Sequence, residues 1–485
     1  MTALLLTMAA INLLTALSSE TRLPTAHLVA AVLAVYLAVE AHLLLRRADA
    51  LSLLSPAFLA LLFHFALSYL AGPTMAAFEP TVMTRFAFWL PDFDAALTDT
   101  LILAMIAAFC MLRSYALARP FARGLRRSLK RMPALRREIR PNVTVALAMQ
   151  VGYLALVAYA IDLGVYGLLS RPEALERHLD AVALFNLGLA AGSLSYFLLL
   201  LHYFGRRGRA SSVETAAIVA LIALHVALGL LAAFKSQAVF PFVIAGFAYF
   251  LTHRRLPVGF LAMALLALVV AYAVVEPFRG YLALRGEPPG SVVEAVETLE
   301  TAFRLREQVT QQHDNTVAER VAERVDLSGM SMLALDYVDR GNLQDHRRRE
   351  FQNSILLAPI LAYIPRAVWP NKPSFQDVGR WFNQRVRGHW WDETTSVGMG
   401  PIGYLYVTGG ILGVILGFAL FGGLQALIFE GFGRAGAGGL IVYLSVAANL
   451  VMIPSAFGPV VTGVLRMLPI AFVAQMLLIR PAPRR

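Results

Sequence analysis

The sequence is poor in the residues and motifs on which most soluble enzymes depend. It has one cysteine, Cys110, in 485 residues, so no disulfide can form within the chain. Charged residues make up 15% of the chain, against about 25% in soluble domains. There is no Walker A loop, no G-x-G-x-x-G turn after a predicted strand, no G-x-S-x-G, and no H-E-x-x-H or C-x-x-C spacing. We therefore expect neither a metal site nor a nucleotide cofactor.

Hydrophobic residues dominate the composition. They form 58% of the chain, and the mean hydropathy is +0.63. A helix that crosses a bilayer needs roughly 20 apolar residues. Segments near this length predict an all-α, polytopic membrane protein with about 12 transmembrane helices. The predicted spans are 2–18, 26–45, 51–71, 96–115, 142–164, 181–204, 215–234, 237–252, 256–277, 400–428, 437–456 and 459–479.

The basic residues predict how these spans are oriented. The net charge of +11 would suit nucleic-acid binding, but the arginines and lysines cluster in short loops, where they set topology. The largest cluster lies between Arg113 and Arg140, and smaller ones lie at 46–47, 206–209 and 254–255. With twelve spans, these clusters and both termini share one side, which the positive-inside rule makes cytoplasmic. We expect no nucleic-acid partner.

The segment 278–399 then lies on the outer side and reads as a helical loop. Ser291 and Glu294 form a capping-box pattern. Apolar residues recur from Met330 to Val338, and Gly341 suits a helix end. The run 355–364 is apolar but too short to span a membrane, so it predicts a short surface or re-entrant helix. The sequence thus predicts three blocks: spans 1–9 in residues 1–277, an outer helical loop in 278–399, and spans 10–12 with a cytoplasmic tail in 400–485.

One stretch of this loop, YIPRAVWPNKPS at 363–374, combines a stiff backbone with cations. Three prolines restrict the backbone, and Arg366 and Lys372 flank Trp369. Arginine binds phosphate through a bidentate fork and lysine binds it as a point charge. The stretch therefore predicts a site for an anionic, sugar-bearing ligand at a membrane surface.

Other residues share the predicted depth of this stretch. Lys235, Arg279 and Arg466 lie at or just below the outer surface, where they are expected either to help bind an anion or to snorkel and form ion pairs. Trp369 and the pair Trp390 and Trp391 suit either stacking on sugar rings or anchoring at the interface. In the tenth span, the G-x-x-x-G pair at 413 and 417 is typical of close helix packing.

These blocks in this order resemble the Wzy-type oligosaccharide repeat-unit polymerases of bacterial O-antigen and exopolysaccharide synthesis. The resemblance is carried by FKSQ at 234–237, ERVDLSGM at 323–330, IPRAVWPNKP at 364–373 and TTSVGMGPIGYLYVTGGILG at 394–413. It covers the C-terminal half of the chain and is only topological over residues 1–200. The chain departs from the family where Tyr404 and Thr408 stand in place of the common Glu and Asn, so no role of that carboxylate carries over.

The resemblance implies a metal- and nucleotide-independent glycosyltransferase of the GT-C-like class in the bacterial inner membrane, with the long loop periplasmic. Its substrate would be an undecaprenyl-diphosphate-linked oligosaccharide, and its expected partners are membrane lipids, a chain-length regulator and a flippase. The glycosyl diphosphate is an activated donor, and cations should stabilise its leaving group. The expected diphosphate ligands are Arg366 and Lys372, supported by Arg279, Lys235, Arg324 and Arg466. A general base for the acceptor hydroxyl is left open among Asp336, Asp339, Asp377, Asp392, Glu393 and His389.

Other functions remain compatible with the sequence. An O-antigen ligase has the same membrane setting and donor but delivers the glycan to lipid A core. A lipid-linked oligosaccharide flippase or transporter without chemistry would use buried residues such as Glu40 and Asp99 for ion coupling, but it predicts internal repeats, which the sequence does not show clearly. A structural partner of a synthase complex is a further alternative.

Overall fold

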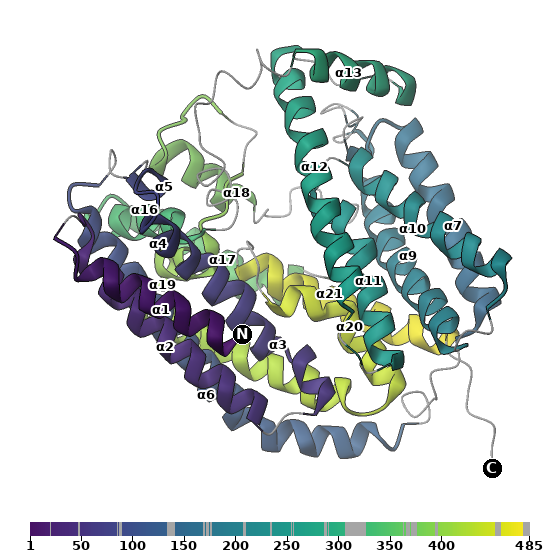
Figure 1. Cartoon of the computed structure of the whole chain (residues 1–485), viewed down its shortest axis with the longest axis horizontal. Coiled ribbons are helices and arrows are strands. Elements are labelled where there is room, and N and C mark those ends of the chain that lie inside the picture. The colour runs from purple at the N-terminus through teal and green to yellow at the C-terminus, as the bar shows by residue number, and fades with distance from the viewer. Residues whose placement is uncertain are drawn as a thin grey trace. The chain divides into compact units, whose positions relative to one another are not determined.

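The structure is a computed structural model of the whole chain, and the parts that it describes are helical (Figure 1). The residues outside this description are 20, 47–48, 85, 87–89, 133–140, 168–169, 171–173, 175–176, 207–209, 233–234, 254, 256, 286–288, 290, 306–325, 362, 365–368, 370–375, 393–395, 452–456 and 479–485.

Each of the twelve predicted spans falls on helical structure. Among the described residues, eight helices are long and apolar enough to cross a membrane. The segments at 2–16, 191–205, 237–253 and 438–451 are shorter apolar helices. The prediction of a polytopic, all-helical membrane protein is therefore confirmed at this level, while the count of twelve spans stays a prediction.

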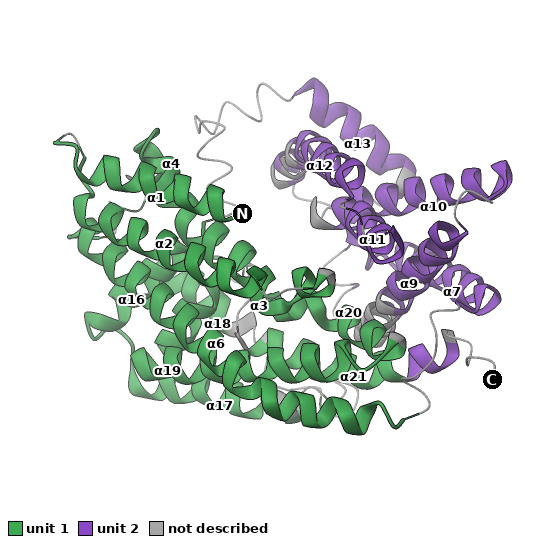
Figure 2. Cartoon of the chain, turned by 60° about the horizontal axis from the view of Figure 1, so that its bottom comes forward, with its two compact units in different colours: residues 1–136, 315–472 green, residues 137–314, 473–485 purple. Residues whose placement is uncertain are grey.

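The chain forms two compact units, which Figure 2 colours separately. Unit 1 comprises residues 1–136 and 315–472, and unit 2 comprises 137–314 and 473–485. The predicted outer loop 278–399 is therefore divided between the two units, because its first helix belongs to unit 2 and the rest to unit 1.

Unit 1 consists of helices from both ends of the sequence, although the last six residues of α21, 473–478, belong to unit 2. Its elements before the unit 2 insertion are α1 (Thr2–Ala16), α2 (Pro24–Arg46), the 3₁₀-helix η1 (Ala50–Leu54), α3 (Pro56–Leu59), the π-helix η2 (Ala60–Leu70), α4 (Ala71–Ala76), α5 (Thr81–Thr84) and α6 (Phe93–Leu129). Those after it are α16 (Ser328–Asp339), α17 (Asp345–Leu361), α18 (Gln376–Trp381), the π-helix η4 (Phe382–Val386), α19 (Gly400–Ala426), the π-helix η5 (Leu427–Gly433), α20 (Ala437–Val451) and α21 (Phe457–Leu478).

Helices α2, α6 and α19 run in the same direction. The carboxylate of Asp94, at the start of α6, accepts from the backbone N–H of Ala26 at the start of α2, at 2.9 Å. Further along, Glu40 of α2 forms an ion pair with Arg113 of α6. Gly422 of α19 meets the Met111 carbonyl so closely that a Cβ would lie 2.0 Å from it. A glycine is needed at this crossing of α6 and α19 because no side chain fits between them.

Unit 2 contains α7 (Val143–Asp162), α9 (Leu179–Gly205), α10 (Ser212–Leu231), α11 (Lys235–His253), α12 (Val258–Arg285) and α13 (Val292–Arg304). A polar contact joins three of these helices. Gln150 of α7 bonds the Nε2 atom of His225 on α10 at 2.7 Å and accepts from Ser195 of α9 at 2.9 Å. The His225 ring packs between Tyr153 and Tyr196, so His225 has the partners of a structural core residue.

The described parts of the predicted outer loop are helical, as expected. Ser291 caps α13 by accepting from the Glu294 N–H at 3.2 Å. Gly341 has φ +72° directly after α16, as the predicted helix end requires. Residues 355–361 of the apolar run form the C-terminal part of α17, which begins ten residues earlier in a charged stretch. The short helix expected there is therefore one part of a longer one.

Candidate functional site

Helix α16, which begins in the ERVDLSGM block, is fixed at its start by Asp326. This buried carboxylate accepts from the Ser328 hydroxyl at 2.6 Å and from the Gly329 N–H at 3.2 Å. Carboxylates at a helix start satisfy backbone N–H groups that have no partner within the helix. Gly72 of α4 lies so close that a Cβ there would be 2.5 Å from an Asp326 oxygen. Residues 326–330 of the block therefore form a capped helix start packed on α4.

The same helix holds the start of α19. Leu327 donates its N–H to the Ser68 carbonyl of η2 at 2.8 Å. Ser331 donates its hydroxyl to the Met399 carbonyl at 2.9 Å and shares a hydrogen bond with the Tyr69 hydroxyl at 3.2 Å. The described parts of two sequence blocks that carry the family resemblance, 326–330 and 396–413, are therefore joined in space by α16 and α19.

Helix α19 is broken at its eleventh residue. Gly410 has φ +59° and ψ −151°, a conformation that only glycine adopts readily. The carbonyl of Thr408, just before the break, accepts from the side-chain amide of Gln352 on α17 at 2.7 Å. A Cβ on Gly413 would lie 2.4 Å from the Leu405 carbonyl of the same helix. Gly413 therefore allows α19 to approach itself across the break, whereas the sequence suggested packing on another helix.

A polar cluster lies where α6, α16, α17 and α19 meet. The Tyr406 hydroxyl of α19 donates to Oδ1 of Asp339, the last residue of α16, at 2.7 Å. Asp99 of α6 is near enough for its charge to act on both residues, and Arg348 of α17 acts on Tyr406. Asp99 and Asp339 are exposed. We call Asp99, Asp339, Arg348 and Tyr406 the carboxylate cluster, and it offers an open carboxylate beside a tyrosine and an arginine.

The two predicted base candidates on α16 have different surroundings. Asp336 is tied to Arg340, whose Nε atom lies 3.0 Å from Oδ1 and 2.9 Å from Oδ2. Asp339 uses Oδ1 for Tyr406, and no described residue forms an ion pair with its carboxylate. Asp339 is therefore the better placed of the two to accept a proton from an incoming hydroxyl.

The side chains of most predicted diphosphate ligands, and of two predicted base candidates, are outside the part of the chain that the structure describes. Arg324, Arg366, Lys372 and Glu393 lie outside the described residues, and only the backbone is described for Lys235, Arg279 and Asp377. Arg466 is exposed on α21. The Tyr363 hydroxyl, at the start of YIPRAVWPNKPS, donates to the Leu465 carbonyl at 2.7 Å. Tyr363 therefore lies beside the residue that precedes Arg466 in the chain, and the roles of the stretch and of Arg466 stay predictions.

The predicted aromatic residues are exposed. The accessible fraction is 40% for Trp369, 75% for Trp390 and 64% for Trp391. The turn that carries the pair is held in place, because His389 donates its N–H to the Asn383 carbonyl and Asn383 donates to the Asp392 carboxylate, both at 3.1 Å. Asp392 and His389, two further base candidates, therefore help to support this turn.

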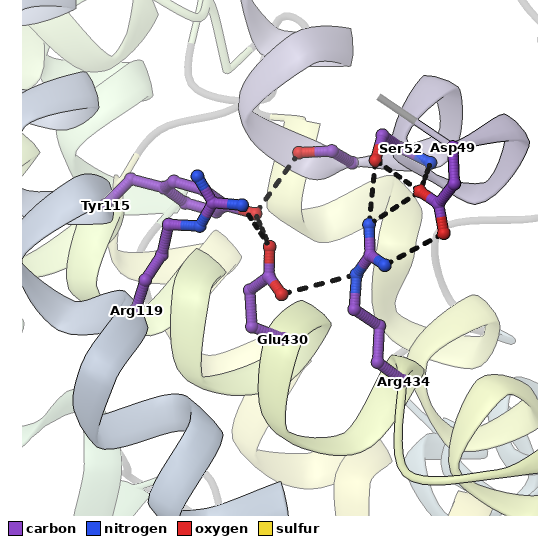
Figure 3. A network of polar contacts seen from close by, with 7 residues as sticks. Asp49, Ser52, Tyr115, Arg119, Glu430 and Arg434 are labelled. Carbon is purple, nitrogen blue, oxygen red and sulfur yellow. Dashed lines mark hydrogen bonds and ion pairs between the residues drawn. The ribbon is translucent and has the colours of Figure 1, made fainter. Parts of the chain in front are cut away.

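A second polar network lies at the other end of unit 1 (Figure 3). Arg434 binds both oxygens of Asp49, at 3.0 and 2.9 Å, and lies 3.2 Å from the buried Glu430. Glu430 also meets Arg119 and the Tyr115 hydroxyl of α6, each at 3.3 Å. The hydrogen bonds from Arg434 lower the pKa of Asp49 to about 2. Every oxygen of the two carboxylates is engaged by the protein, so this network joins η1, α6 and η5 rather than offering an open site.

Sequence reasoning did not single out Tyr406 or Arg348. Tyr406 lies two residues from Thr408 in the GYLYVTGG part of the resemblance, and adjacent glycines in an apolar span were a signal that the helix could break there. Arg348 lies in a run of three arginines that reads as an exposed face. Comparison with known proteins found no matching family, no matching curated protein and no matching solved structure.

Proposed function

We propose that this protein is a membrane glycosyltransferase that polymerises oligosaccharide repeat units carried on a lipid diphosphate, undecaprenyl diphosphate by the resemblance. The observation that carries the proposal is the hydrogen bond from Tyr363 to the Leu465 carbonyl. It brings the start of the stiff, cationic stretch next to Arg466. The proposal gives Arg366 and Lys372 of that stretch and Arg466 of α21 a shared anionic ligand.

The apolar half of α17 supports a lipid-linked substrate. Leu356 and Ile360 are exposed, one turn apart, in the helix that leads directly into Tyr363. Large apolar side chains exposed next to a cationic stretch suit a surface that meets lipid. In the proposed complex the lipid tail lies along such apolar surface, and the diphosphate is held by the cations beyond it.

The reaction would proceed without a nucleotide, because the donor is already activated. The anomeric carbon of the growing chain forms a bond to a hydroxyl oxygen of the incoming unit. Its bond to the diphosphate oxygen breaks, and the leaving group departs as an anion stabilised by Arg366 and Lys372. The acceptor hydroxyl loses its proton to a base. Asp339 is the first base candidate to test, because its carboxylate is exposed and has no described cationic partner.

The finer architecture belongs to the same proposal: twelve spans, a GT-C-like arrangement, a periplasmic loop and both termini in the cytoplasm. The parallel course of α6 and α19 supports it, since Met111 contacts Gly422 and, eight residues further along both segments, Arg119 pairs with Glu430. Two spans that run in the same direction require an odd number of crossings between them. Five helices between α6 and α19 would supply these crossings: α7, α9, α10, α11 and α12.

The test is complementation of a strain that lacks the gene, followed by analysis of its surface glycan. Loss of a polymerase leaves product that carries a single repeat unit, whereas loss of a ligase leaves uncapped core with polymer still on the lipid carrier. Arg366→Ala should fail to restore polymer at normal protein level, and Arg366→Lys should be impaired because lysine lacks the bidentate fork. Full polymer from Arg366→Ala would refute the phosphate-binding role.

A further inference from the structure

Helix α6 is longer than a membrane crossing requires. Its 37 residues give a length of about 55 Å, against about 30 Å for the hydrocarbon core of a bilayer. The first turns of α6 and α2 are in contact, through Asp94 and Ala26. The Glu40–Arg113 ion pair shows that the two helices still lie side by side about four turns later. Helix α2 ends at Arg46, six residues after Glu40. The part of α6 beyond about residue 119 therefore continues past the end of α2, as Figure 1 shows.

The segment 115–131, which comprises the last 15 residues of α6 and the two residues after it, has three distinct faces. Tyr115, Ala122 and Leu129 are buried and recur every seven residues, which places them on one stripe. Leu117 and Phe121, one turn apart, have accessible fractions of 73% and 77%. The remaining face carries cations: Arg119, Arg123, Arg126, Arg127, Lys130 and Arg131.

The charge of the segment has one sign only. Residues 114–132 contain no aspartate or glutamate. Arg123 and Arg127 are exposed, and they lie on a different side of the helix from Leu117 and Phe121. A helix surrounded by water would not expose a leucine and a phenylalanine so fully, and a helix surrounded by acyl chains would not carry exposed arginines. The pattern suits a helix at the boundary between the two.

We propose that residues 115–129 form an interfacial helix that binds the headgroups of anionic phospholipids. Leu117 and Phe121 enter the boundary between headgroups and acyl chains. Arg123, Arg126 and Arg127 bind lipid phosphates, which supply the negative charge that the segment itself lacks. This inference does not depend on the proposed function, because it uses only the length, exposure and charge of α6.

The segment is coupled to the end of α19. Arg119 pairs with the buried Glu430 of η5 at 3.3 Å, and Tyr115 donates to the same carboxylate (Figure 3). Leu129 packs with Ala435, beyond the end of η5. Anionic lipid bound along the segment therefore stabilises the contact between α6 and α19, and the folded protein should become more heat-resistant when such lipid is present.

The first experiment measures this stabilisation. The full-length protein, purified and delipidated in a neutral detergent, is titrated with phosphatidylglycerol or phosphatidylcholine, and its thermal unfolding midpoint is recorded. Phosphatidylglycerol should raise the midpoint more than phosphatidylcholine. The double variant Arg123→Gln, Arg127→Gln should lose at least half of this difference. The matched control is Arg347→Gln, Arg349→Gln on α17, where both arginines are also exposed, and it should keep the difference.

The second experiment locates the apolar face. Because Cys110 is the chain's only cysteine, a Cys110→Ser background allows one fluorophore to be attached at Phe121→Cys or at Arg127→Cys in nanodiscs. Lipids brominated on the acyl chain should quench the first label more than the second. Three results would each overturn the proposal. The two lipids could change the midpoint equally, the control variant could lose the lipid difference as much as the Arg123, Arg127 variant does, or the label at 121 could be quenched only by an aqueous quencher. The last result would indicate water or a protein partner on this face.

Discussion

The hydroxyl of Tyr406 donates to the Asp339 carboxylate across 2.7 Å and so connects the end of α16 to the broken first part of α19. Four residues after Tyr406, Gly410 interrupts the helix. Between them, the Thr408 carbonyl is bonded by Gln352 of α17. One short stretch of α19 therefore orients a carboxylate, breaks its helix and binds a neighbouring helix through its backbone. Such irregular backbone within membrane helices occurs where it is buried in protein or lines a polar site.

The first prediction concerns the base. In a purified transfer assay, Asp339→Asn should slow glycosyl transfer by about 100-fold or more, as expected when a general base is removed. Asp336→Asn is the matched control on the same helix, and it should change the rate less than about twofold because Arg340 already occupies that carboxylate. Binding of the lipid-linked donor, measured by competition, should not change in either variant. Equal rates for wild type and Asp339→Asn would exclude Asp339 as the base.

Tyr406→Phe should have a smaller effect than the loss of Asp339. It removes one hydrogen bond and leaves the carboxylate in place, which corresponds to a rate decrease of about tenfold or less. If Tyr406 orients Asp339, then Tyr406→Phe should have no further effect in the Asp339→Asn background. Independent, additive losses in the double variant would show that the two residues act separately.

Gly410 supplies a prediction with a close control. Gly410→Ala should destabilise the protein by about 1–3 kcal/mol, because its φ and ψ are almost closed to other residues. At both positions an added Cβ would have no neighbouring atom within 4 Å, but Gly409 has no positive φ. Gly409→Ala should therefore be neutral or slightly stabilising. Thermal unfolding of the two variants in the same detergent makes the comparison. Equal midpoints would mean that α19 can straighten without cost.

The sequence predicted the elements better than it predicted their contacts. Hydropathy located every apolar helix, and local signals located the Ser291 cap and the helix end at Gly341. These features depend on residues close together in the chain. The pairing of Tyr406 with Asp339 spans 67 residues, and no local periodicity encodes it. The break at Gly410 was also missed, because a glycine in an apolar span equally indicates close helix packing.

The candidate site was predicted only in part, for a similar reason. Asp336 and Asp339 were equivalent as sequence, since both are acidic residues three apart on a short helix. They differ in their neighbours, because Asp336 pairs with Arg340, whereas Asp339 accepts from Tyr406 of a helix distant in the sequence. The roles of Arg366 and Lys372 stay predictions, because both lie outside the described residues.

The fit between Gly72 and Asp326 gives another prediction. A Cβ at position 72 would lie 2.5 Å from an Asp326 oxygen, and Asp326 is held by the start of α16. Gly72→Ala should therefore cost about 1–3 kcal/mol, as overpacking does. Gly423→Ala, with nothing within 4 Å, should not destabilise. The cost of Gly72→Ala should shrink in an Asp326→Ala background, and an unchanged cost there would place the strain elsewhere.

The last prediction concerns the acid stability of the network around Arg434. The hydrogen bonds from Arg434 lower the pKa of Asp49 from its usual 3.8 to about 2. A lowered carboxyl pKa means that the folded state binds its proton less readily than the unfolded state does. The stabilisation is therefore fully present above pH 3.8 and is lost as the pH falls toward 2. Because the Asp49 side chain is 56% exposed, solvent screening limits the contribution to about 0.5–1 kcal/mol. Thermal unfolding of wild type and Asp49→Asn should give a constant difference at neutral pH that narrows below pH 3.8, and a difference that widens with acid would contradict this assignment.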